Sequence, residues 1–254
     1  MLASHVMLHI ALFAAPFRRD HGEIDCKKMV KPVDVAPVRS PQDVHSIIAW
    51  HVRGKSVVEV GTRNGDGMAC FAQVASSAIA VELAAAYCSK LQVRAAELQN
   101  ATGHTFSVMC KDYRTAPGLD ADVFTWWQET PHLHNPAILM SLRWLQERGQ
   151  IRKDAVAIMV FDTGWGDDMD DFQNLHRLGW PSWTATVDGV NERAGCLTHF
   201  RHKPYVCNRV TNGTYHVMGL ELKKVGLSCA DHHATDRWKA RCSRAKPPPP
   251  TPSG

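Results

Sequence analysis

The residues best suited to bind a ligand surround a turn that carries very little side-chain bulk. The stretch VVEVGTRNGDG places Gly61, Gly65 and Gly67 directly after the apolar run Val57–Val60. Glycine adopts positive φ readily and lets a ligand come close to the backbone. If a strand ends at Val60 and a helix begins near Gly67, backbone N–H groups and the helix dipole favour negative charge at this turn. The turn is therefore a candidate ligand-binding loop.

Two common nucleotide-binding motifs do not match this turn. A dinucleotide loop has the spacing G-x-G-x-x-G, whereas the glycines here follow G-x-x-x-G-x-G. A Walker loop requires Gly-Lys-Ser/Thr, and that triplet does not follow. A nicotinamide-dependent oxidoreductase is therefore disfavoured. On the glycines alone, a tight connection that binds no ligand remains the alternative.

Acidic and aromatic residues end the apolar runs that follow. Glu82 ends the run AIAVEL, at about the separation expected for an acid that binds ribose hydroxyls. Asp112 follows the third run, and Trp126 and Trp127 end the fourth. The carboxyl ends of parallel strands meet at one edge of a sheet, where such folds bind ligands. We therefore expect these residues to lie beside the glycine turn.

The elements that would position these residues alternate along the chain. Short apolar runs rich in β-branched or aromatic residues predict strands at Ser56–Val60, Ala78–Leu83, Thr105–Cys110, Asp122–Trp127 and Ala155–Phe161. Apolar residues at helical spacing predict helices at Gln42–Arg53, Leu83–Asn100, Pro136–Gln150 and Asp167–Leu178. This alternation predicts an α/β fold, with a mostly parallel sheet and helices on both faces.

The alternation ends after the fifth strand. Trp183–Val187 and Cys196–Arg201 resemble strands, and the stretch DGVNERAG between them leaves no room for a helix. We therefore expect an antiparallel hairpin to close a sheet of seven main strands. Tyr215–Lys223 has the composition of one further strand, whose place in the sheet the sequence does not give.

In this order of features, Gln42–Lys203 resembles the class I S-adenosylmethionine-dependent methyltransferases, whose Rossmann-like fold has five βα units and a closing hairpin. By resemblance, Glu59–Gly67 looks like the first motif of the family, which wraps the amino-acid part of the cofactor. Glu82 looks like the acid that holds the ribose hydroxyls. Asp112 is similar to the residue that contacts the adenine amino group, and Phe124–Trp126 to the segment beneath the donor methyl.

The resemblance implies S-adenosylmethionine as the cofactor. The residues expected to bind it are Glu59, Gly61, Thr62, Arg63, Asn64, Gly65, Gly67, Glu82, Leu83, Lys111, Asp112, Tyr113, Phe124, Thr125 and Trp126. The loop has two more residues before its second glycine than the common E-x-G-x-G-x-G motif, as in some small-molecule O-methyltransferases. The metal-binding acid that those enzymes often carry after strand four is replaced by Trp126-Trp127-Gln128, so we expect no metal.

A catalytic base is needed only if the acceptor arrives protonated, because methyl transfer is an in-line displacement in which the protein mainly aligns the reactants. His132 and Glu129 follow the fourth strand and are the candidate bases, with His134 nearby. Loop residues without a chemical role are the alternative. Trp126 and Trp127 could form an aromatic cage for a methylammonium or planar acceptor, or could pack in the core.

Cysteine and charge distribution suggest a compartment and partners. Eight cysteines occur without a C-x-x-C pair, several of them in apolar runs, so we expect reduced, buried thiols. The alternative is a zinc site of nonstandard spacing. Its candidate ligands are Cys207, Cys229, His232, His233 and Cys242. The formal net charge of +4 is concentrated in Leu222–Lys246, so the near-neutral main body does not require nucleic acid as a partner.

The N-terminal apolar run Val6–Ala15 has no basic residue before it, unlike a signal peptide, and no run reaches the roughly 18 to 20 residues of a membrane span. We expect a cytoplasmic protein, with targeting by this run as the alternative. The expected regions are an irregular lead-in at 1–40, a methyltransferase-like domain at 41–225 and a basic, proline-rich tail at 226–254.

The function expected from this resemblance is transfer of a methyl group from S-adenosylmethionine to a small-molecule acceptor. The alternative is a non-catalytic relative that uses the same fold as an interaction scaffold, with the basic tail as its contact surface. The sequence identifies neither the acceptor nor the atom that is methylated.

Overall fold

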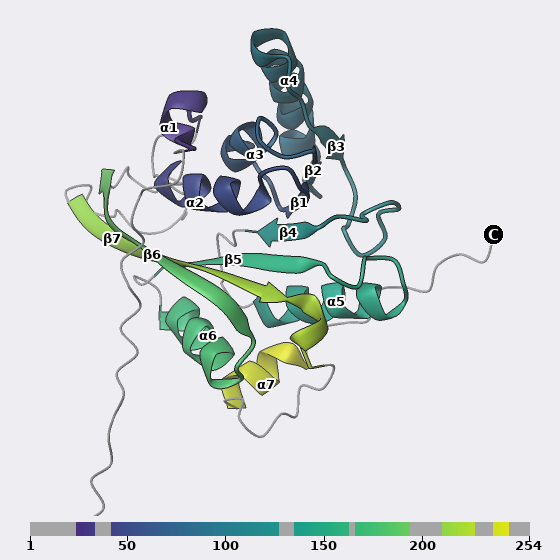
Figure 1. Ribbon diagram of the computed structural model, residues 1–254, viewed down its shortest axis with the longest axis vertical. Coiled ribbons are helices and arrows are strands. Elements are labelled where there is room, and N and C mark those ends of the chain that lie inside the picture. Colours follow the sequence, from purple (N-terminus) through teal and green to yellow (C-terminus); the bar gives the residue numbers. More distant parts are fainter. Residues whose placement is uncertain are drawn as a thin grey trace, which may run out of the picture.

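The computed structural model describes residues 24–33, 42–126, 135–162, 166–193, 210–226 and 236–243. A single seven-stranded sheet runs through its centre (Figure 1). The strands are β1 Ser56–Val60, β2 Ser77–Val81, β3 Ser107–Met109, β4 Val123–Trp126, β5 Val156–Asp162, β6 Pro181–Arg193 and β7 Val210–Glu221. The α-helices are α1 Cys26–Met29, α2 Gln42–Val52, α3 Asp66–Phe71, α4 Ala85–Thr102, α5 Asn135–Glu147, α6 Gly166–Arg177 and α7 Asp236–Cys242.

The strand order of the sheet is β3-β2-β1-β4-β5-β7-β6. β1 pairs in parallel with β2 and β4, and the parallel pairing continues to β3 and β5. β7 is antiparallel to both β5 and β6. The expected mostly parallel, seven-stranded sheet with an antiparallel closing hairpin is therefore confirmed. Because the strand order reverses at β1, the carboxyl end of β1 is the place where a fold of this kind binds a ligand.

Helices cover both faces of the sheet (Figure 1). Successive residues of a strand point to opposite faces, and Val57 and Val58 of β1 accordingly enter different clusters. The cluster around Val57 includes buried residues of α2, α3 and α4. The cluster around Val58 includes residues of α5, α6 and α7. No helix among the described residues combines the length and hydrophobicity needed to cross a membrane.

The closing hairpin differs in detail from the expected one. β6 continues through Arg193, so most of the stretch expected to be the turn is strand. Its partner is β7, in which Met218 pairs with Thr184. The run Tyr215–Lys223, expected as one extra strand, therefore supplies the second strand of the hairpin, and Cys196–Arg201 lies outside the described residues. Local composition found both runs but could not decide which one pairs with β6, because strand pairing depends on long-range contacts.

The connection from β3 to β4 contains turns and no helix. The resemblance implied five βα units, whereas, of the first five strands in the described part of the chain, β1, β2, β4 and β5 are followed by a helix and β3 is not. Pro117 and Gly118 lie in this connection, and Gly118 has a positive φ of 71°. These residues interrupt helices and favour turns.

Helix α7 lies in the region 226–254, which was expected to be a basic, proline-rich tail. Trp238 and Cys242 are 3% and 1% exposed, and both belong to the cluster that includes α5. Residues four apart lie on one side of a helix, so these two side chains form a buried face of α7. This part of the stretch is therefore packed against the core.

All cysteines among the described residues are disulfide-bonded, which corrects the expectation of reduced thiols. Cys26 is joined to Cys70 of α3, and Cys88 of α4 is joined to Cys110 after β3. Cys242 also forms a disulfide, so it is not available as a zinc ligand. The other candidate ligands, Cys207, Cys229, His232 and His233, lie outside the described residues. The described residues contain no group of three or more side chains that could hold a metal ion.

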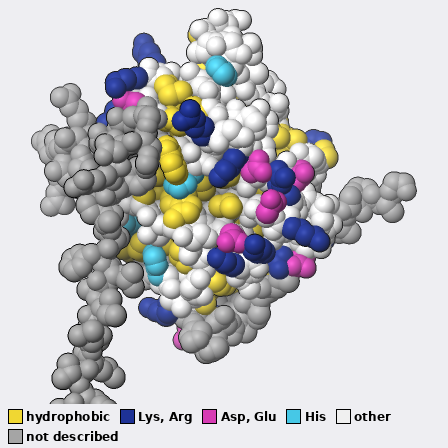
Figure 2. All heavy atoms as spheres, in the orientation of Figure 1, with side chains coloured by type: hydrophobic (Ala, Val, Ile, Leu, Met, Phe, Trp, Pro, Cys, Tyr) yellow, Lys and Arg dark blue, Asp and Glu magenta, His cyan; other side chains and the backbone are white. Residues whose placement is uncertain are grey.

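The surface charges of the described residues are mixed. On the face shown in Figure 2, Lys and Arg side chains lie among Asp and Glu side chains, with no continuous basic stripe. Arg152, for example, pairs with Asp122 and with Asp154. A protein that binds nucleic acid through its backbone phosphates normally shows a basic stripe or patch, and this face has none among the described residues.

Candidate functional site

The glycine turn connects the carboxyl end of β1 to the first residue of α3. Gly61 and Gly65 have φ values of 72° and 77°, a conformation that glycine adopts without steric cost. The Gly61 N–H donates to the Val81 carbonyl of β2 at 2.8 Å, and the Gly65 N–H donates to the Thr62 carbonyl at 3.0 Å. The Thr62 hydroxyl donates to the Glu59 carbonyl at 3.0 Å. These bonds fix the turn at the edge where β1 and β2 end.

The three glycines meet different surroundings. A Cβ on Gly65 would lie 2.7 Å from Cδ2 of Leu91, and one on Gly67 would lie 3.0 Å from Oε1 of Glu59. A side chain at either position would therefore displace a neighbouring side chain, Leu91 or Glu59, and both positions favour glycine. A Cβ on Gly61 would meet no atom within 4 Å. Gly61 thus borders open space, where a ligand could approach the backbone.

Glu82 follows the carboxyl end of β2, and three backbone N–H groups hold its carboxylate. Oε2 accepts from the Arg63 N–H at 2.9 Å, and Oε1 accepts from the N–H groups of Leu83 and Ala84, each at 2.9 Å. Hydrogen bonds to a carboxylate are stronger than those between neutral groups. The structure therefore brings Glu82 and the glycine turn together at one edge of the sheet.

Leu83 lies next to this buried acid but is itself 74% exposed, the highest value among the exposed large apolar side chains of the described residues. Single exposed apolar side chains are common on protein surfaces. Here, however, the exposed leucine directly follows the acid at the strand end. The pair offers a hydrogen-bond acceptor and an apolar surface side by side.

The segment after β3 carries the next three predicted residues. Asp112 pairs with Arg114, whose Nε lies 3.0 Å from both carboxylate oxygens. The hydrogen bonds from Arg114 hold the pKa of Asp112 below its usual value, so this side chain is charged at neutral pH. Tyr113 packs against the cluster that includes α5, and burial raises its pKa. Lys111 is exposed.

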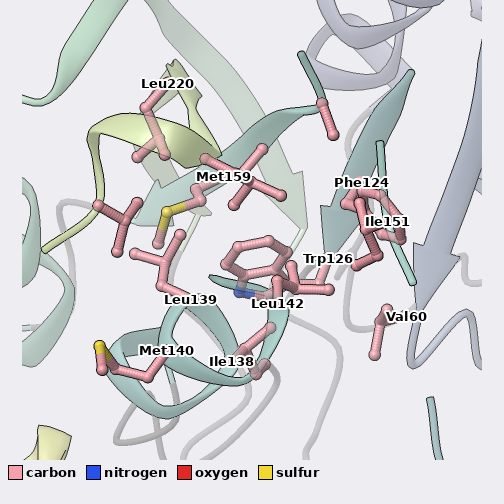
Figure 3. Packing of buried hydrophobic residues seen from close by; sticks show 14 of the residues in the cluster. Val60, Phe124, Trp126, Ile138, Leu139, Met140, Leu142, Ile151, Met159 and Leu220 are labelled. Atoms are coloured by element: carbon pink, nitrogen blue, oxygen red, sulfur yellow. The ribbon is translucent and has the colours of Figure 1, made fainter. Parts of the chain in front are cut away.

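The fourth-strand segment is buried, with Phe124, Thr125 and Trp126 all 1% exposed or less. The indole of Trp126 lies beside Leu139 and Leu142 of α5 (Figure 3), and its Nε1 donates to Oδ1 of Asn135 at 2.9 Å. The side chain of Trp126 is thus part of the core, and it cannot form one wall of an aromatic cage. Trp127 and the candidate bases Glu129, His132 and His134 lie outside the described residues.

Glu59 lies beneath the glycine turn in an unusual protonation state. Burial raises its pKa from 4.5 to about 8, and the nearby charges of Asp66 and Glu82 act in the same direction. Its Oε2 is buried and has no hydrogen-bond partner among the described residues. His45 of α2 lies on the same side of Gly67, and burial lowers its pKa to about 4, so it is neutral. The turn therefore lies next to a neutral carboxylic acid.

An ion pair beside the turn was missed by the sequence analysis. Asp66 begins α3, has a fully buried side chain and lies 2.6 Å from Nη2 of Arg94 on α4. The position of Asp66 between two glycines at a helix start was the available signal, because acids are favoured there. Nothing in the sequence pattern indicated Arg94 as its partner.

Known proteins resemble this chain in fold and not in sequence. No family model matches the sequence, and no curated protein matches it significantly. A precorrin-6y C5,15-methyltransferase from Geobacter metallireducens is 10% identical, with a TM-score of 0.48 over 78% of this chain and 97% of that chain. Magnesium protoporphyrin IX methyltransferase from Synechocystis PCC 6803, solved with bound S-adenosylmethionine, is 15% identical, with a TM-score of 0.46 over 71% and 79%.

A tRNA (m1A58) methyltransferase from Aquifex aeolicus is 14% identical, with a TM-score of 0.46 over 73% of this chain and 71% of that chain. These likenesses are too distant to assign a residue or an acceptor to this chain. The strand order and the position of β7, rather than these likenesses, identify the fold.

Proposed function

We propose that this chain, which has the class I methyltransferase fold, binds S-adenosylmethionine and transfers its methyl group to a small-molecule acceptor. The observation that best supports the proposal is the hydrogen bond from Arg63 N–H to Oε2 of Glu82, at 2.9 Å. It joins the acid that follows β2 to the glycine turn, which follows β1, the strand at which the strand order reverses. Ligands of such sheets bind at that point.

The residues around the turn fit the parts of such a cofactor. The open side of Gly61 allows close approach to the backbone, and the carboxylate of Glu82 is an acceptor for ribose hydroxyls. Leu83 offers an apolar surface for a purine ring. Oε2 of Glu59 is buried and has no hydrogen-bond partner in the described part of the chain, and it suits the amino group of the methionine part, because a cation stabilises the carboxylate form. When bound, the cofactor supplies a methyl group on a positively charged sulfur.

The protein's own contribution would be alignment. Displacement at a methyl group requires the two reacting atoms to lie in line, and fixed positioning accounts for much of the rate enhancement in such reactions. The short glycine turn and the bonds to Glu82 restrict how the cofactor can lie. His132 and Glu129 remain our proposed bases for an acceptor that arrives protonated, since both follow β4 in the sequence.

A small-molecule acceptor is favoured over nucleic acid because charges of both signs are mixed on the face shown in Figure 2. One observation favours the alternative of a non-catalytic scaffold. The carboxylate of Glu82 already accepts hydrogen bonds from three backbone N–H groups, so the conformation of the turn is fixed without a ligand. Cofactor binding separates the two functions, since a scaffold of this kind needs no cofactor.

The disulfides bear on the compartment. Disulfides persist in oxidising compartments and are rare in the cytosol. Cys26–Cys70 lies within the folded core and Cys88–Cys110 joins α4 to the exposed residue after β3, so we propose an oxidising compartment in place of the expected cytoplasm.

The test of the proposed function has two steps. Titration calorimetry with S-adenosylmethionine measures binding, and mass spectrometry then follows a fractionated cell extract incubated with protein and cofactor. The proposal predicts saturable binding and one compound that gains the mass of a methylene group. Absence of heat at saturating cofactor would reject it, and binding without any methylated product would favour the scaffold.

A further inference from the structure

Residues 24–33 form a strap that is bonded to α2, α3 and α4. Cys26 is joined to Cys70 of α3 by a disulfide, and its N–H donates to Oγ of Ser46 in α2 at 3.0 Å. At the other end, the Val33 N–H donates to both carboxylate oxygens of Asp66, at 2.9 and 3.1 Å. The strap is thus fixed at both ends, and its second attachment is the residue that ends the glycine turn.

Arg94 of α4 connects three segments of the chain. Its Nη2 lies 2.6 Å from Oδ1 of Asp66 and donates to the Lys31 carbonyl of the strap at 3.3 Å. Its Nη1 donates to the Asn64 carbonyl in the glycine turn at 3.1 Å. The planar guanidinium presents several donors in fixed directions, which lysine cannot reproduce. One side chain therefore connects the strap, the glycine turn and α4.

Arg63, which precedes Asn64 in the glycine turn, has a strained backbone. Arg63 has a φ of 57°, and it is the only non-glycine residue with positive φ in the described part of the chain. Such a conformation persists when the surroundings determine it strongly. Glu82 holds Arg63 from one side through its N–H, and Arg94 holds the next residue, Asn64, through its carbonyl. The two contacts together define how the turn presents its N–H groups.

We propose that Arg94 and Asp66 are positioning residues that keep the glycine turn in its cofactor-binding conformation and make cofactor affinity depend on the strap. This inference rests on the proposed function. Buried ion pairs are in general weak contributors to stability, so a role in conformation fits this pair better than a role in stability alone. Lys31, Val33, Asn64 and Arg94 also line a groove of about 750 Å³. Because the groove lies between the strap and α4, the bonds of Arg94 bridge a gap that side-chain packing does not fill.

The experiment compares Arg94→Met with Arg143→Met. Arg143 of α5 is a matched control, because its side chain is 14% exposed against 12% for Arg94. It also pairs with an acid, Glu147, and donates to a backbone carbonyl, that of Val225 at 3.2 Å. Arg143 belongs to the opposite face of the sheet. Its loss should therefore lower stability without altering the glycine turn.

S-adenosylmethionine affinity and amide hydrogen exchange are measured for both variants and the wild type. We expect Arg94→Met to weaken the affinity about tenfold and to speed exchange at residues 62–66. Arg143→Met should leave both unchanged, with a smaller loss of Tm, because its partner Glu147 is 48% exposed whereas Asp66 is fully buried. Arg94→Lys retains the positive charge but not the planar set of donors, and it should recover part of the affinity. It also keeps the proposal testable if Arg94→Met does not fold.

The outcomes separate the two proposals. If the wild type binds and both Arg94 variants bind equally well, the positioning role is wrong and the proposed function stands. If Arg143→Met weakens affinity as much as Arg94→Met, the effect is one of stability and the positioning role is again wrong. If the wild type does not bind the cofactor, both proposals fail.

Discussion

The backbone N–H of Arg63 lies 2.9 Å from Oε2 of Glu82. The two residues belong to consecutive βα connections, so this single bond shows that the turn after β1 and the end of β2 form one surface. Arg63 also has a left-handed backbone, with φ at 57°. The bond therefore holds the turn in a conformation that most residues avoid.

The raised pKa of Glu59 predicts how stability changes with pH. Its folded-state pKa is about 8, against 4.5 for the ordinary side chain. The folded protein therefore keeps a proton that the unfolded chain releases above pH 4.5, so the contribution of Glu59 is full below that pH and is lost as pH rises to about 8. Because glutamine does not titrate, the Glu59→Gln variant lacks this decrease in stability between pH 4.5 and 8. The Tm of the variant minus that of the wild type should grow from pH 4.5 to 8, and a constant difference would contradict the assignment.

Glu59 should also release a proton when the cofactor binds. A cationic amino group beside its carboxyl stabilises the charged form and lowers its pKa. Asp66 and Glu82 are the charged groups that now oppose ionisation. At pH 7, calorimetry in buffers of different ionisation enthalpy should show proton release by the wild type and none by Glu59→Gln. Equal proton counts for the two proteins would remove Glu59 from the binding site.

Gly61 and Gly103 form a matched pair for testing the open side of the turn. Both have positive φ, at 72° and 77°, and a Cβ on either would meet no atom within 4 Å. Alanine at either position should therefore cost about 1 kcal/mol of stability, because left-handed backbone is unfavourable for residues with a Cβ. Only Gly61→Ala should weaken cofactor binding. Thermal unfolding and calorimetry on both variants check this, and equal effects on binding would be evidence against approach at Gly61.

The Cys88–Cys110 disulfide should stabilise the segment that carries Asp112. It joins residues 22 apart in sequence, and a loop of that length corresponds to about 3 kcal/mol in the chain-entropy treatment. The double variant Cys88→Ser/Cys110→Ser should lose stability of this order. It should also show faster amide exchange at residues 110–113. The double variant Cys26→Ser/Cys70→Ser is the control, and it should leave exchange at 110–113 unchanged.

Much of the fold could be predicted because both faces of the sheet are covered. Strands buried on both sides become short continuous apolar runs, and Ser56–Val60 was predicted with its observed bounds. The convergence of Glu82 with the glycine turn followed from the parallel arrangement alone. Strand pairing at the hairpin did not follow, because two runs had strand character and only tertiary contacts select between them.

Features that depend on three-dimensional proximity could not be predicted. The expectation of reduced thiols was wrong because apolar surroundings suit both a buried thiol and a disulfide. Trp126 was considered as one wall of an aromatic cage, but its side chain packs beneath α5, and sequence alone does not tell which face of the sheet a strand residue occupies. Arg94 was missed because its three partners come from segments up to 63 residues away.

Cofactor binding beside Glu82 is best tested by calorimetric titration of S-adenosylmethionine into the wild type and into Glu82→Gln. The variant keeps the size of the side chain but loses the carboxylate that receives the Arg63 N–H. We expect saturable binding at one site in the wild type, and at least about tenfold weaker binding in the folded variant, because the variant lacks a charged hydrogen-bond acceptor. Equal affinity of the two proteins, or no heat from the wild type at saturating cofactor, would contradict this expectation.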